Sequence, residues 1–214
     1  MPADSSETRH VLEQAVRGDT SAWGDLLARH RTRLCRMVAV RMDTRLHGRV
    51  DASDVIQEAY LEAWSRLPEY VREPNMPFFL WLRFLTAQKL ITLHRHHLGA
   101  RMRDAGLEIS LHQGSMPAAS SAALAAQLLG KGTRPSEAAM RAELKIQLQD
   151  ALNRLEPLDR EVLALRHIEQ LSRAECAHLL DISEAAVSKR YFRALKRLKA
   201  VLISTPGGGG DFWP

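Results

Sequence analysis

The sequence predicts an all-α protein of two small helical domains joined by a flexible linker. Apolar residues recur at helical spacing along most of the 214 residues, and the strict alternation of a half-buried strand is nearly absent. Between two such regions the chain is rich in Ala, Ser and Gly and cannot bury much apolar surface. We place the domains at residues 7–100 and 136–203, with a linker at 101–135 that has room for one short helix. Residues 204–214 form a flexible tail.

Composition and charge indicate a soluble protein with an anionic partner. The apolar content of 45% supports hydrophobic cores, and the net charge is +5 with a pI of about 9.6. The N-terminal MPADSSETRH is polar, and no apolar run reaches the roughly 18 residues of a membrane span. Cys35 and Cys176 lie far apart in apolar helical patterns, which is typical of buried thiols in a reducing compartment. We expect a cytoplasmic protein.

Four helices are expected in the first domain. The stretch DSSE at 4–7 begins a short helix that ends at RGD, and a second helix begins near Ser21. Asp51 can cap a third helix. The fourth helix spans roughly residues 78–97. The segment LPEYVREPNMP at 67–77 has three prolines and is predicted to be a loop.

The third predicted helix carries carboxylates at i, i+3, i+7 and i+11, on roughly one face: Asp51, Asp54, Glu58 and Glu62. Three interpretations stay open, namely a solvated face with charge bias at the helix start, a docking surface for a basic partner, and the metal site of a nuclease. A metal site needs ligands from a second element, and none is evident. The run HRHH at 94–97 also lacks a second ligand cluster.

The stretch from Leu171 to Lys199 has the pattern of a helix-turn-helix. Ser172 and Glu175 form a Ser-x-x-Glu capping box, which sets the start of a short helix. Asp181 can take the left-handed conformation of a tight turn, and Ser183 can cap the next helix. That helix carries six basic residues with no acid among them: Lys189, Arg190, Arg193, Lys196, Arg197 and Lys199.

The basic charge of this last helix has two interpretations. It belongs either to a solvated helix on a bundle or to a helix that binds DNA. Because the caps, the turn and the basic helix agree in register, the pattern favours DNA. In that arrangement the N-terminal residues of the helix contact base edges, and cations farther along contact phosphates.

The segment LNRLEPLDREVLALRHIEQLSRAECAHLLDISEAAVSKRYFRALKRLK resembles region 4 of bacterial RNA polymerase sigma factors of the sigma-70 family. AVRGDTSAWGDLLARHRTRL resembles the start of region 2, and DASDVIQEAYLEAW resembles its segment for the clamp helices of the largest polymerase subunit. FLWLRFLTAQKLITLHRHH resembles the helix that opens and reads the downstream promoter element. With a linker in place of region 3, the chain is similar to the extracytoplasmic-function (ECF) group.

The resemblance implies three sets of binding residues. Contacts to the upstream promoter element would come from Glu184, Ala185, Ser188, Lys189, Arg190, Arg193, Lys196 and Arg197. Surface contacts to the downstream element would come from Arg83, Gln88, Lys89 and Arg95. Contacts to polymerase would come from Asp51, Asp54, Gln57, Glu58 and Glu62. Phe78, Phe79 and Trp81 could shape a pocket for an extruded base, although aromatic residues at helical spacing are more often core.

The resemblance also implies which partners the protein binds and which features it lacks. Core RNA polymerase and promoter DNA are the expected partners, with an anti-sigma factor as a further one. No catalytic residue, cofactor, metal or membrane insertion is expected. Two other functions remain open: a stand-alone helix-turn-helix regulator of duplex DNA, and a metal-dependent nucleic-acid enzyme that uses the acidic face.

Five positions depart from the family pattern. Asp181 stands where glycine is usual in the turn, and Cys176 replaces a branched aliphatic residue. Gln88 and Thr92 stand where Asn and Asp are common in the melting helix, and Ala186 replaces a frequent hydroxyl residue. The promoter sequence that this protein recognises therefore cannot be inferred from better-known members of the family.

Overall fold

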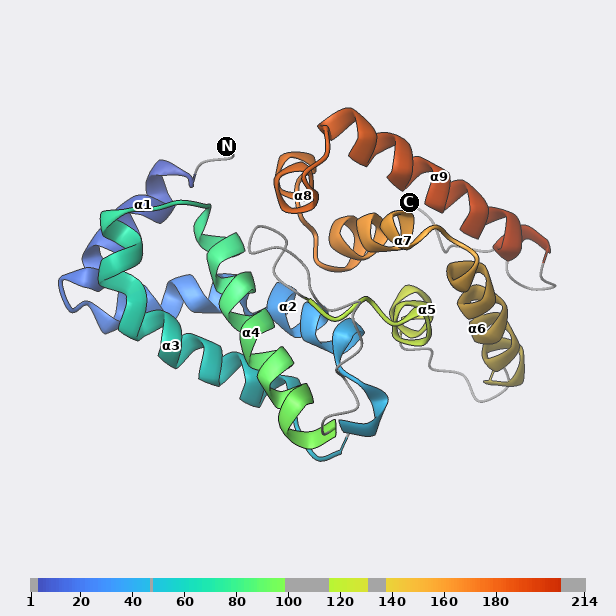
Figure 1. Ribbon diagram of the computed structural model, residues 1–214, viewed down its shortest axis with the longest axis horizontal. Helices are drawn as coiled ribbons and strands as arrows, with labels where there is room; N and C mark the ends of the chain where they lie inside the picture. Colours follow the sequence, from blue (N-terminus) through green and yellow to red (C-terminus); the bar gives the residue numbers. More distant parts are fainter. Residues whose placement is uncertain (1–3, 47, 99–115, 131–137, 205–214) are drawn as a thin grey trace. The chain divides into compact units, whose positions relative to one another are not determined.

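A computed structural model describes residues 4–46, 48–98, 116–130 and 138–204 of the chain, and every regular element in these ranges is a helix (Figure 1). The all-α prediction is confirmed. Contacts divide the chain into two compact units. Helices α1–α4 build the first, and α5–α7, α9 and most of α8 build the second. No helix in the described ranges is long and apolar enough to cross a membrane.

The first unit consists of α1 (Ser6–Val16), α2 (Thr20–Arg41), a 3₁₀ turn (Thr44–Leu46), α3 (Ala52–Arg72) and α4 (Phe78–Leu98). Side chains cap three of these helices, because the first N–H groups of a helix have no partner inside it. Ser5 accepts from the N–H of Thr8, Asp19 from those of Ser21 and Ala22, and Asp51 from that of Ser53.

Helix α4 lies at the centre of the first unit's core. It contacts α2 and α3, and its Phe78, Leu82, Leu85 and Leu90 are fully buried. A helix that is apolar around most of its circumference has to be enclosed in this way. Asp4 caps α4 from far away in sequence, since its carboxylate oxygens accept from the N–H of Phe78 at 2.9 and 3.0 Å.

The predicted loop at 67–77 is wrong in its first half. Helix α3 continues to Arg72 with Pro68 inside it. Packing outweighs the missing proline N–H, because Leu67 and Tyr70 on the last turns are buried. The single proton of the Tyr70 hydroxyl is shared between two acceptors, Asp4 Oδ2 at 3.0 Å and the Met76 carbonyl at 2.8 Å.

The second unit consists of α5 (Ser121–Leu129), α6 (Ala138–Asn153), α7 (Pro157–Leu163), α8 (Arg173–Leu180) and α9 (Glu184–Ser204). Helix α7 runs on into a wider π-type turn, Ala164–Ile168. The core of the second unit includes Leu124, Leu148, Leu152, Val162, Leu163, Leu165, Val187, Ala194 and Leu198. Helix α6 contacts both α5 and α9, and α7 contacts α9, so α9 is held by two other helices.

Helix α5 lies within the segment predicted as a linker. Its Leu124, Ala125 and Leu129 are buried, and it packs on α6. It is the one short helix for which the prediction left room. Residues 101–115 and 131–135 of the linker and the tail from residue 205 onward lie outside the described residues. The domain boundaries therefore stay a prediction.

The helix-turn-helix has the local geometry that the sequence predicts. In the capping box, the N–H of Glu175 donates to Ser172 Oγ at 3.1 Å and the N–H of Ser172 donates to Glu175 Oε2 at 2.6 Å. Asp181 has a φ of +53°, which is the left-handed conformation expected in the turn. Ser183 Oγ accepts from the N–H of Ala186 at 3.1 Å. All three local predictions are confirmed.

Candidate nucleic-acid interface

Helix α9 separates an apolar face from a basic one. Val187, Ala194 and Leu198 are buried on the side that contacts α6 and α7. Four cations lie exposed elsewhere on the helix: Lys189, Lys196, Arg197 and Lys199. Among the described residues, no acidic side chain pairs with any of these four. Their charge is therefore available to an anion outside the protein.

The start of α9 presents small and acidic side chains. Glu184 and Ala185 are exposed, and Ser188 is half-buried. The Ser188 hydroxyl donates to the Glu184 carbonyl at 3.1 Å within the same helix. Its oxygen can still accept a hydrogen bond. These three residues lie at the end of α9 that a helix-turn-helix presents to base edges.

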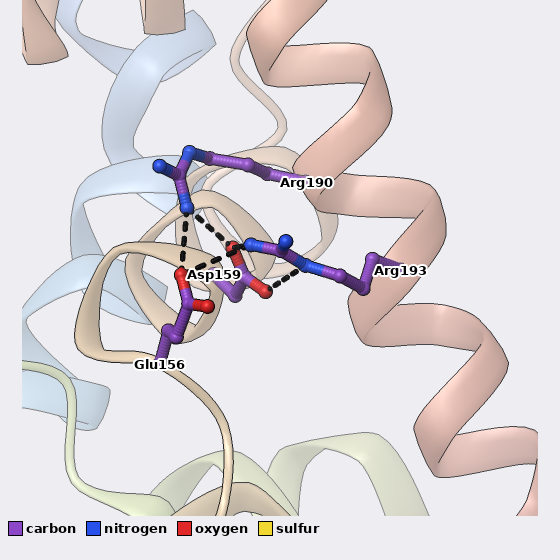
Figure 2. A network of polar contacts seen from close by, with 4 residues as sticks. All are labelled: Glu156, Asp159, Arg190 and Arg193. Atoms are coloured by element: carbon purple, nitrogen blue, oxygen red, sulfur yellow. Dashed lines mark hydrogen bonds and ion pairs between the residues drawn. The ribbon is translucent and has the colours of Figure 1, made fainter.

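Arg190 and Arg193 differ from the other basic residues of α9, because they bind two carboxylates at the start of α7 (Figure 2). Arg193 Nε donates to Asp159 Oδ2 at 2.6 Å, and Arg193 Nη2 donates to Asp159 Oδ1 at 2.7 Å. Arg190 Nη1 donates to the same Oδ1 at 2.9 Å. A single oxygen of Glu156, Oε2, accepts from Arg190 Nη1 at 3.1 Å and Arg193 Nη2 at 3.0 Å.

The two acids of this network lie in different environments. The Asp159 side chain is 0% exposed, whereas that of Glu156 is 56% exposed. Burial raises the pKa of Asp159, but the hydrogen bonds from Arg193 and Arg190 outweigh burial, and the pKa is lowered overall. The same bonds to Asp159 raise the pKa of both arginines. The four side chains thus form a neutral cluster that ties α9 to α7.

Sequence analysis missed the role of Glu156 and Asp159. The one signal was spacing, because two acids three residues apart at the start of α7 match two arginines three residues apart on α9. More than 30 residues separate the two pairs, so no local rule connects them. The structure therefore places Arg190 and Arg193, both predicted to contact DNA, on acids of their own unit.

The residues predicted for the downstream element do not share one surface. Gln88 and Arg95 are exposed on α4, and Lys89 is half-buried. Arg83 was expected at the surface, and that expectation is wrong, because its side chain is only 4% exposed. Its neighbours one turn away, Leu80 and Ala87, are buried, so position 83 lies on an enclosed side of α4.

The aromatic residues at the start of α4 are core. Phe78, Phe79 and Trp81 are buried, and the Trp81 ring stacks on Tyr70 with 4.4 Å between ring centroids. The Arg33 guanidinium lies 3.5 Å from the centre of the Phe79 ring, a cation–π contact. The structure therefore shows these aromatic residues as part of the hydrophobic core and not as the lining of a pocket for an extruded base.

The acidic residues of α3 have unequal roles. Asp51 and Asp54 form the capping box that starts the helix, and Gln57 and Glu58 are exposed. Glu62 is partly buried and pairs with two cations: Arg66 Nη2 lies 2.7 Å from Oε1, and Lys89 Nζ lies 2.6 Å from Oε2. The structure thus joins a predicted polymerase-binding residue to a predicted DNA-binding one.

Two large apolar side chains, Leu61 and Trp64, are exposed beside the acids of α3, although Trp64 was expected in the apolar stripe of this helix. An exposed aromatic side chain is typical of surfaces that bind another protein. In the described part of the chain, no group of three or more His, Cys, Asp or Glu side chains could hold a metal ion. Within the run at 94–97, His94 is buried while His96 and His97 are exposed.

Two family comparisons cover most of both units. Residues 26–98 match the family described as sigma-70 region 2, and residues 145–198 match sigma-70 region 4. These ranges include α3 and α4 in the first unit, and α7, α8 and most of α9 in the second. The network of Figure 2 lies entirely inside the region 4 match.

Individual relatives agree with the family comparisons. The chain is 31% identical over 199 residues to the RNA polymerase sigma factor CnrH of Cupriavidus metallidurans, covering 91% of this chain and 93% of that one. It is 28% identical over 202 residues to the ECF RNA polymerase sigma factor SigD of Mycobacterium tuberculosis, covering 94% and 85%.

A solved structure agrees as well. The structure of CnrH in complex with the cytosolic domain of CnrY matches with a TM-score of 0.53 and 25% identity, covering 93% of this chain and 99% of that one. The order of the two regions, their helical architecture and these relatives together give one assignment. The chain belongs to the sigma-70 family of RNA polymerase sigma factors, in its ECF group.

Proposed function

We propose that the protein binds core RNA polymerase and directs it to promoters, with the two units on different promoter elements. The observation that carries this proposal is the exposed basic face of α9, which follows a capped helix-turn-helix. Its four cations pair with no acid in the described part of the chain. A stand-alone regulator would explain that face, but it would leave the region 2 unit without a role.

In this proposal α9 lies in the major groove of the upstream element. Glu184, Ala185 and Ser188 at its start are nearest the base edges, followed by Lys189. Lys196 and Arg197 are farther along and contact phosphates, which adds affinity and salt dependence without reading sequence. A bidentate base contact is worth about 1–3 kcal/mol of discrimination. Arg190 and Arg193 can contribute to DNA binding only when they are released from Glu156 and Asp159.

The first unit binds polymerase through α3 and the downstream element through α4. Asp54, Gln57 and Glu58 are exposed on α3 and suit basic residues of the polymerase clamp. On α4, Gln88, Lys89 and Arg95 are the proposed contacts to the separated strand, which the exposure of Gln88 and Arg95 supports. Arg83 is withdrawn from that surface by its burial.

The protein acts in the cytoplasm, where its polymerase is, and it has no catalytic step of its own. The polymerase performs the chemistry, and this chain selects where it starts. The likeness to CnrH, whose structure was solved in complex with the cytosolic domain of CnrY, supports a protein partner that binds this chain. An anti-sigma factor is the proposed class of that partner.

The experiment that tests this function is a pull-down of purified core RNA polymerase with the full chain, followed by run-off transcription on a genomic promoter library. Stable binding with a selective set of transcripts is the expected result. A folded, inhibitor-free protein that binds duplex DNA but not polymerase would contradict it and favour a stand-alone regulator.

A further inference from the structure

Glu156 occupies the N-cap position of α7 but does not cap it. Its side chain accepts no hydrogen bond from the first N–H groups of the helix, and Pro157 follows at the first helical position. The carboxylate instead turns to Arg190 and Arg193 on α9 (Figure 2). A residue that stabilised only its own helix would use that oxygen for the backbone.

The network holds its two arginines with unequal strength. Arg193 forms a two-pronged pair with buried Asp159 through Nε and Nη2. Arg190 is held through Nη1 alone, so the difference lies in the number of donor atoms and not in exposure, since the side chains of Arg190 and Arg193 are 28% and 38% exposed. Asp159 is fully buried, so it cannot lose both cations without leaving an unpaired buried charge. Arg190 is therefore the arginine that can leave while Arg193 stays.

Arg190 is held by its hydrogen bond to Asp159 and, in addition, by Glu156. With Glu156 the cluster has two negative and two positive charges. Without the Glu156 charge, one carboxylate would face two guanidinium groups that share its Oδ1. Arg190 would then gain more from a DNA phosphate than from a carboxylate oxygen that already accepts from Arg193.

We propose that Glu156 competes with DNA phosphates for Arg190, and thereby lowers the part of DNA binding that does not depend on sequence. This inference rests on the proposed contact of α9 with promoter DNA. A phosphate contact adds affinity equally at every site, so restraining one leaves the base contacts of α9 with a larger share of the binding. The restraint favours promoter selection over binding elsewhere.

The test measures binding of the full chain to a fluorescein-labelled random-sequence 20-base-pair duplex by anisotropy, over a series of KCl concentrations. Glu156→Gln removes one negative charge and keeps the size of the side chain. We expect tighter binding by about fivefold to tenfold near 0.1 M salt, and a slope of log K against log salt steeper by about 0.9, the value for one added phosphate contact.

The matched control is Asp150→Asn, which removes the same charge from an exposed side chain of α6 outside the network. It should bind DNA nearly as the unmodified chain does. The inference is overturned if Glu156→Gln binds no tighter than Asp150→Asn. It is also overturned if Glu156→Gln binds tighter but the slope of log K against log salt is unchanged.

A second measurement asks whether Glu156 acts through Arg190. In an Arg190→Gln background, Glu156→Gln should gain no more affinity than Asp150→Asn does, because the released cation is gone. An undiminished gain in that background would also overturn the inference. Polymerase binding and run-off transcription by the unmodified chain test the proposed function separately, so the two failures are distinguishable.

Discussion

Predicted DNA-binding cations are paired with acids in both units, but the pairing differs in kind. In the first unit, partly exposed Glu62 on α3 bridges Arg66 and Lys89, so one acid serves two cations. In the second unit, Glu156 and Asp159 serve Arg190 and Arg193, and Asp159 is fully buried. The first cluster keeps a net positive charge, whereas the second is neutral and has a desolvated anchor.

The difference shows that burial, more than the number of ion pairs, decides which cations can leave the protein. An exposed ion pair contributes little to stability and exchanges readily with an outside anion. A buried acid keeps at least one cation, because an unpaired charge in the interior is costly. Glu62 is still 19% exposed and keeps Arg66 when Lys89 leaves, whereas Asp159 is fully buried, so Lys89 is available to DNA in a way that Arg193 is not.

The largest expected effect is on the buried anchor of the second unit. Asp159→Asn should lower the free energy of unfolding of that unit by about 3 kcal/mol, because it removes the buried charge that both arginines bind and leaves them only exposed Glu156. Hydrogen exchange of backbone amides in α7 and α9 measures this loss, with the amides of α3 as an internal control. Exposed Glu156→Gln should cost less than about 1 kcal/mol. Equal losses of stability for the two changes would contradict the different roles of buried Asp159 and exposed Glu156.

The next effect concerns the surface of α3 that lies outside the Glu62 cluster. Asp54→Lys combined with Glu58→Lys should weaken binding to core polymerase at least tenfold, or about 1.4 kcal/mol, because both charges of the proposed contact are reversed. Surface plasmon resonance with immobilised polymerase measures the affinity, and circular dichroism verifies folding. Glu13→Lys combined with Asp25→Lys, which reverses two exposed charges on α1 and α2 instead of α3, is the matched control. Equal weakening by the control would reject the docking face.

A smaller effect separates the free cations of α9 from the paired ones. Lys189→Ala should reduce transcription that depends on the upstream element about fivefold and leave polymerase binding unchanged, since Lys189 has no acidic partner in the described residues. Run-off assays on promoters with and without the upstream element give the ratio. Lys145→Ala on α6 controls for the loss of one charge. Arg193→Ala is less informative, because it also disrupts the contact between α7 and α9.

The smallest effect is a pH dependence of stability in acid. Hydrogen bonds from the Arg45 side chain lower the pKa of Asp43 to about 2, although burial acts in the opposite direction. Since this folded pKa lies below the unfolded value near 3.9, the stabilisation is complete above about pH 4 and is lost as the pH falls through about 2. Urea unfolding should show Asp43→Asn less stable than the unmodified chain at pH 5, and the difference should shrink at pH 2.5. A difference that does not change with pH would refute the assignment.

Local sequence patterns predicted the helix-turn-helix well. Ser172 with Glu175, Asp181 and Ser183 act on backbone groups within three or four residues, so their geometry follows from the local chain. The same reasoning failed at Pro68, where burial of Leu67 and Tyr70 keeps the chain helical. It also failed at Arg83, because a cation within an apolar helix gives no sign of which side faces the core.

The sequence by itself determined the class of the fold, the order of the two regions, the helix caps and the basic character of α9. Each of these depends on residue types at fixed short spacing, where backbone hydrogen bonding and hydrophobic periodicity decide the outcome. Tertiary structure decided which cations are free. Arg190 and Lys189 are neighbours in sequence, but packing of α9 on α7 brings only Arg190 to Asp159 and Glu156. That outcome depends on contacts more than 30 residues apart, which no local pattern encodes.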